Sequence, residues 1–73
     1  MNAIERHTHE TIAARILAEY NRPDTTERER AALRRSVRRD IPNSRKYSTA
    51  YHLALLLGIP TDNLGANLKR TAA

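Results

Sequence analysis

Cysteine, tryptophan and phenylalanine are all absent from this sequence of 73 residues. Without cysteine, the chain can form neither a disulfide nor a thiolate metal site, and nothing indicates an oxidising compartment. An apolar set made of leucine, isoleucine, valine and three tyrosines suits a compact helical bundle better than a deep ligand cavity. A chain of this length has room for one domain with a small core. We therefore expect residues 1–73 to form a single domain.

Long apolar segments are missing as well. The longest apolar run, Leu53–Leu57, is far shorter than the roughly 20 residues that a membrane-spanning helix needs. The start of the chain has neither the basic residues nor the apolar stretch of a secretory signal peptide. We expect a cytoplasmic protein that does not enter a membrane.

Residue patterns that carry catalysis or hold a metal ion are also lacking. With two glycines in the chain there is no glycine-rich phosphate loop, and no Ser-His-Asp set or catalytic pair of acids is apparent. His7 and His9 point in different directions on a helix, so they do not share a metal ion. His52 stands alone beside Tyr51, and we expect it to be a packing residue. The sequence predicts a protein that is not an enzyme and that uses no cofactor or metal ion.

Positive charge is present in excess, and it is concentrated in one stretch. The formal net charge is +5. Residues 25–46 contain eight basic and three acidic side chains, whereas residues 1–24 contain three basic and four acidic ones. Because the excess charge is concentrated in one stretch, it is better explained by binding to an anionic partner than by a need for general solubility.

Helical periodicity and capping residues predict most of the secondary structure. Asn2 and Glu5 form an N-terminal capping pair, and the apolar residues that follow recur at helical spacing, which predicts a helix over residues 3–20. Thr26 and Glu29 form a capping box for a second helix over about 26–40.

The second half of the chain predicts two shorter helices. A third helix is expected from about Ser48 to Leu57, where Gly58 ends it. Because this helix has apolar groups, Leu55 included, on more than one side, we expect it to be central and to pack on the first helix. A short fourth helix over about 61–70 is expected to be capped by Thr61. The predicted fold class is all-α, a small bundle of about four short helices.

The helix over 26–40 carries the strongest functional signal. Its apolar strip is narrow, and its arginines fall into two rows, one of Arg30, Arg34 and Arg38 and one on the far side. Guanidinium groups stay charged and present a flat fork of donors that matches phosphate. The alternative is an ordinary solvated surface whose arginines pair with neighbouring acids. The expected contacts to a nucleic-acid backbone are Arg28, Arg30, Arg34, Arg35, Arg38, Arg39, Arg45, Lys46, Lys69 and Arg70.

The stretch from Ala50 to Leu68 resembles the helix-turn-helix of phage Cro and repressor proteins. The resemblance is carried, over about 20 residues, by Ala54, Gly58, Ile59, Leu64 and Leu68. It implies a helix-turn-helix-like C-terminal hairpin whose second helix enters the major groove of DNA, as in a small transcription regulator of phage or plasmid type. The base-contact candidates that it implies are Thr61, Asn63 and Asn67. Such proteins commonly dimerise, so a homodimer is expected.

Other functions remain open at this point. The segment Arg30–Ser36 resembles the N-terminal part of the small helical subunit of Cascade-type CRISPR surveillance complexes, which also binds nucleic-acid backbone. RNA is therefore an alternative to DNA. A protein-interaction module, such as a phage-encoded inhibitor or an assembly subunit that docks on an acidic protein, is the rival from another class. Tyr47 and Tyr51 could stack on bases of a single strand, although a packing role is favoured.

Overall fold

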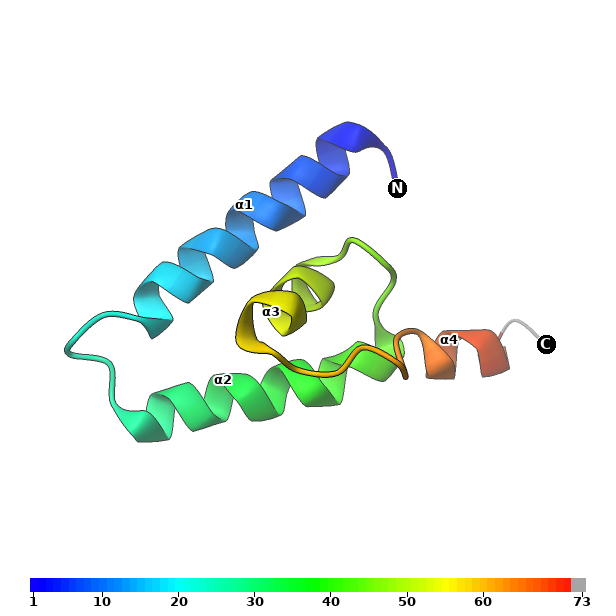
Figure 1. The fold of residues 1–73 in the computed structure, drawn as a ribbon. Coiled ribbons are helices and arrows are strands. Elements are labelled where there is room, and N and C mark those ends of the chain that lie inside the picture. The colour runs from blue at the N-terminus through cyan, green and yellow to red at the C-terminus, as the bar shows by residue number, and fades with distance from the viewer. Residues whose placement is uncertain (72–73) are drawn as a thin grey trace.

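The chain forms four α-helices and one short 3₁₀ helix, with no strand in the described part (Figure 1). A computed structural model describes the backbone of residues 1–71 and the side chains of residues 1–68. The elements in chain order are α1 (Ala3–Tyr20), α2 (Glu27–Asp40), η1 (Ile41–Asn43), α3 (Thr49–Leu57) and α4 (Ala66–Thr71). The predicted all-α class is confirmed.

The helix ends form as the local sequence predicts. The Asn2 side chain accepts a hydrogen bond of 2.9 Å from the Glu5 amide at the start of α1. Thr26 and Glu29 form a complete capping box at the start of α2. Gly58 ends α3 at φ 71, a left-handed conformation that glycine adopts without a side-chain clash. Each cap satisfies backbone groups that the first or last turn of a helix leaves open.

The helices form a flat, V-shaped arrangement. α1 and α2 diverge from the turn that joins them, and α3 lies between them towards the open end of the V (Figure 1). α3 packs against both α1 and α2, so the predicted packing of the first helix on the third is confirmed. The molecule measures 45 × 26 × 15 Å along its principal axes, so it is little thicker than one helix with its side chains.

A small core fills the space where α3 meets the other elements. Its fully buried apolar residues are Ala13, Val37, Ile41, Leu53, Ala54 and Ile59. Ile41 in η1 is the largest of these side chains with less than 2% exposure. The backbone of η1 also packs against α2, α3 and α4, so this short turn joins the C-terminal elements to the core.

Only one side of α3 is buried, which differs from the expectation for this helix. Leu53 and Ala54 face the core, whereas Leu55 and Leu56 are 56% and 52% exposed. The central position of α3 was predicted correctly, but the idea that Leu55 adds a second buried side was wrong. The side of α3 that carries Leu55 and Leu56 is in contact with solvent.

The C-terminal segment also departs from the expected helix over 61–70. Thr61 does not cap a helix, because α4 begins only at Ala66; the Leu64 amide donates to the Thr61 carbonyl at 3.1 Å within a turn. Gly65 has φ 69, and its amide donates to the Ile41 carbonyl at 3.0 Å. This left-handed residue stops a helix from running through the segment, so α4 begins only at Ala66 and packs mainly on η1.

Candidate nucleic-acid interface

The arginines of α2 divide into an inward and an outward set. Arg30 and Arg34 belong to the inward set, on the side that faces the end of α1. The Arg30 Nε atom donates to the Tyr20 carbonyl at 2.8 Å, and its Nη2 atom donates to the Arg22 carbonyl at 3.0 Å. Carbonyls at the C-terminal end of a helix lack partners within the helix, and a cation there also suits the helix dipole. Arg30 therefore closes the end of α1.

Arg34 ties the same two helices together through side chains. Its Nη1 atom donates to the Tyr20 hydroxyl at 2.6 Å, and its Nη2 atom donates to a Glu27 carboxylate oxygen at 2.7 Å. Hydrogen bonding to the Arg34 guanidinium lowers the pKa of Glu27, and the same bond raises the pKa of Arg34. Arg30 and Arg34 were expected to contact a nucleic-acid backbone, but both are engaged in the fold, since α1 ends beside their face of α2.

The outward set is a line of three exposed arginines, Arg28, Arg35 and Arg39, here called the outer row. Spacings of seven and four residues place them on one face of α2, and at 1.5 Å per residue they span about 16 Å. Arg39 approaches Asp40 at 3.6 Å and the Ser36 hydroxyl at 3.4 Å. Arg28 and Arg35 have no hydrogen bond or ion pair with any described residue.

The outer row leaves room for a bulky ligand to approach the helix. Ala32 is exposed between Arg28 and Arg35, and its methyl group does not shield the helix surface. Glu29, the nearest acid in the first turn, is occupied by its bonds to Thr26, which lower its pKa. Arg28 and Arg35 therefore present guanidinium groups that no described carboxylate neutralises, whereas Arg39 lies close to Asp40.

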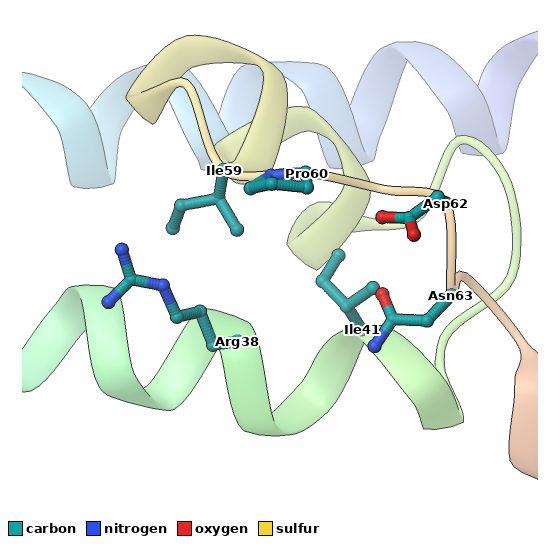
Figure 2. Close-up of a pocket in the computed structure, with 6 residues that line it drawn as sticks. All are labelled: Arg38, Ile41, Ile59, Pro60, Asp62 and Asn63. Atoms are coloured by element: carbon teal, nitrogen blue, oxygen red, sulfur yellow. The ribbon is translucent and has the colours of Figure 1, made fainter.

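Further cations lie in the last turn of α2 and in the loop that follows η1. Arg38 is exposed at the rim of an open hollow of about 330 Å³ (Figure 2). Arg45 is exposed and makes no ion pair with the described residues, and Lys46 lies over the Tyr47 ring with its Nζ atom 5.2 Å from the centroid. All three side chains are exposed.

A tyrosine cluster connects this basic surface to α1. The Arg6 guanidinium lies 3.7 Å from the centroid of the Tyr47 ring, and the Tyr51 ring meets Tyr47 edge-on at 5.6 Å. Tyr47 has φ 69, an uncommon conformation for a residue with a side chain. Both tyrosines are half-buried and packed. The contribution of Arg6 was not foreseen, because 41 positions separate it from Tyr47 and no local pattern links them.

The three base-contact candidates do not share a helix. Thr61 is half-buried and Asn63 is exposed, and both lie in the turns before α4. The Asn67 Nδ2 atom, in α4, donates to the Asn43 Oδ1 atom of η1 at 3.1 Å. The backbones of Lys69 and Arg70 are helical, but their side chains lie outside the described residues.

The histidines have separate surroundings. The His9 Nδ1 atom lies 2.7 Å from the Thr49 hydroxyl and links α1 to α3, whereas His7 is exposed. The His52 Nε2 atom is buried without a hydrogen-bond partner. Among the described residues, no three side chains of the His, Cys, Asp and Glu types are grouped closely enough to hold a metal ion. None of the described helices has the length and apolar character required to cross a bilayer.

Comparisons with known proteins give no match, since no protein-family model, curated protein or solved structure is significantly similar to this chain.

Proposed function

We propose that this protein is a small nucleic-acid-binding protein, not an enzyme, that holds the phosphate backbone with the outer row of α2. The observation that carries the proposal is the split between the two arginine sets: Arg30 and Arg34 are bound within the fold, whereas Arg28 and Arg35 are exposed and bond to no described residue. Fixed guanidinium groups on a rigid helix can contact successive phosphates. DNA is the proposed partner, and RNA offers the same phosphate chemistry.

This surface supports affinity more than sequence reading. Phosphate contacts position a protein on nucleic acid, whereas contacts to base edges supply discrimination. A major-groove reader over residues 61–70 has less support, because turns occupy the first half of that segment and α4 has six residues. A regulator of transcription built on this domain would occupy DNA through α2.

The test is a salt series of binding measurements with random double-stranded and single-stranded DNA. For the parent, the logarithm of the association constant should fall linearly with the logarithm of salt concentration. Replacing Arg28, Arg35 and Arg39 by Gln should weaken binding to all sequences and flatten the slope by about one unit per lost phosphate contact.

A matched pair of single variants controls for net charge. Arg35→Gln and Arg15→Gln each remove one exposed arginine that has no ion pair with the residues the structure describes, the first from the outer row and the second from α1. Only Arg35→Gln should flatten the salt slope. Equal losses in the two variants, or a parent that binds no nucleic acid at low salt, would contradict the proposal.

A second candidate function is protein interaction, here self-association through α3. The observation that favours it is the adjacent exposed pair Leu55 and Leu56. Exposed leucines that are buried between two copies would gain the free energy of removing apolar surface from water. Sedimentation of the parent and of the Leu55→Gln, Leu56→Gln variant tests it. A parent that sediments as a monomer at all concentrations would rule out the homodimer.

A further inference from the structure

The hollow at the end of α2 brings together a cation, an acid and an apolar wall. It is lined by Arg38, Ile41, Ile59, Pro60, Asp62 and Asn63. Figure 2 shows Ile59 and Pro60 facing Arg38 and Ile41 of α2 and η1 across the hollow, with Asp62 and Asn63 at its far end. The hollow is built by chain segments that are about 20 residues apart in sequence, because the stretch after α3 crosses over η1.

The two charged side chains of the hollow, Arg38 and Asp62, do not form an ion pair with each other. Arg38 and Asp62 enter it from opposite ends, and neither makes a hydrogen bond or ion pair with a described residue. Both are exposed, so each remains available to a ligand. The volume of about 330 Å³ lies at the small end of the ~300–1,000 Å³ that is usual for small-molecule sites.

From this geometry we propose that the hollow holds one unstacked nucleobase, with guanine preferred, from a single strand whose phosphates contact the outer row. This inference rests on the proposed function. Arg38 directly precedes Arg39 in α2 and is rotated from it by about 100°, so the hollow lies beside the C-terminal end of the outer row, about a quarter of a turn around the helix. Pro60 offers the base an apolar face, and the Arg38 guanidinium can stack on a base or reach the adjoining phosphate.

Asp62 gives the hollow its preference for guanine. An ionised carboxylate has two acceptor oxygens and no donor. The Watson–Crick edge of guanine offers two parallel donors, N1–H and N2–H, whereas thymine offers one N–H there and adenine and cytosine each offer one amino group. The neighbouring Asn63 amide can donate to guanine O6. Guanine is therefore the one common base that can bond to both Asp62 oxygens at once.

The position of Asp62 is also hard to explain by backbone binding alone. A carboxylate in the same hollow as Arg38 repels phosphate and weakens binding that depends on charge only. Opposite two N–H donors, the same carboxylate is attractive. Asp62 therefore shifts the binding preference from any strand towards strands with a guanine in the hollow.

The experiment uses the full chain and short oligothymidine strands that carry one central guanine, hypoxanthine or thymine. Hypoxanthine is the matched probe, since it lacks only the exocyclic amino group of guanine. Fluorescence anisotropy at low salt should show the guanine strand binding roughly 5-fold more tightly than the thymine strand, with hypoxanthine in between. This part of the test requires no variant.

Two charge-matched variants complete the experiment. Asp62→Asn should abolish the guanine preference, and Glu10→Gln, which removes an exposed acid from α1, should leave it intact. Equal affinity of the parent for the three strands, or an unchanged preference in Asp62→Asn, overturns the inference while the outer row stands. Binding to duplex alone, with no binding to any single strand, also overturns it. A parent that binds no strand or duplex at low salt overturns the proposed function as well.

Discussion

Arg34 and Arg35 are neighbours in the sequence, identical in chemistry, and opposite in their roles. Arg34 is 29% exposed at its side chain and bonds to Tyr20 and Glu27, whereas Arg35 is exposed and bonds to no described residue. The difference follows from a rotation of about 100° between successive helix positions. The comparison teaches that a count of arginines does not measure a binding surface. In a domain with a small core, some charged side chains, such as Arg34, stabilise the fold and do not contribute to a binding surface.

The largest effect on stability is expected from a substitution in the buried core. Ile41→Ala should lower the free energy of unfolding by about 2–5 kcal/mol, since it empties the position of the largest fully buried side chain. Leu56→Ala, at a position that is 52% exposed, should change it by less than about 1 kcal/mol. Urea unfolding followed by circular dichroism measures both. Equal losses would show that α3 faces another way.

A smaller effect is expected from the inner arginines. Tyr20→Phe removes the hydroxyl that accepts from Arg34 and should cost about 1 kcal/mol. Arg34→Gln should lower the melting temperature, and Arg35→Gln should leave it unchanged. A double-mutant cycle of Arg34 and Tyr20 then measures their coupling. If Arg35→Gln is the more damaging of the two arginine variants, the inner and outer sides have been assigned the wrong way round.

The acids at the start of α2 predict a still smaller, pH-dependent effect. The pKa values of Glu27 and Glu29 are held below their ordinary value of 4.5 by bonds from Arg34 and Thr26. A lowered pKa in the folded state means a contribution to stability that is present above pH 4.5 and lost as the pH falls through the folded values. The variant Glu27→Gln, Glu29→Gln should therefore lose less stability than the parent on acidification below pH 4.5. If the free energy of unfolding of the parent and of the variant falls in parallel as the pH is lowered, the prediction is wrong.

The smallest effect on stability is expected from the outer row, although its substitution should have the largest effect on nucleic-acid binding. Replacing all three arginines of the outer row by Gln should change the free energy of unfolding by no more than about 0.5 kcal/mol. Thermal unfolding without nucleic acid checks this. A large loss of stability would mean that the outer row, like Arg30 and Arg34, supports the fold, and the contrast between the two sides of α2 would disappear.

Local rules in the sequence predicted much of this fold. The capping residues Asn2, Thr26 and Gly58 act within their own turns, and each ends or starts a helix where expected. Gly65 shows where such rules fail. Its left-handed conformation accompanies a hydrogen bond to the Ile41 carbonyl, which is 24 positions away and visible only in the folded chain.

The same limit applies to the candidate site. Helical spacing divided the arginines into a row of Arg30, Arg34 and Arg38 and a row of Arg28, Arg35 and Arg39. In the structure Arg30 and Arg34 are bound within the fold, whereas Arg38 is exposed. Helical spacing could not show which row faces protein, because that depends on where the end of α1 comes to lie. The hollow that contains Arg38 and Asp62 was missed for a similar reason, as it exists only once the chain crosses over η1.

The bond from the Gly65 amide to the Ile41 carbonyl has a consequence for exchange of amide hydrogens with solvent. Gly65 is buried in the turn just before α4, and amides beside a helix of only six residues commonly exchange quickly because such a helix frays. Here its exchange requires η1 to open, and η1 carries the most deeply buried isoleucine of the core. The Gly65 amide should therefore exchange about as slowly as the amides of α3, so that the terminal segment opens with the core as one cooperative unit.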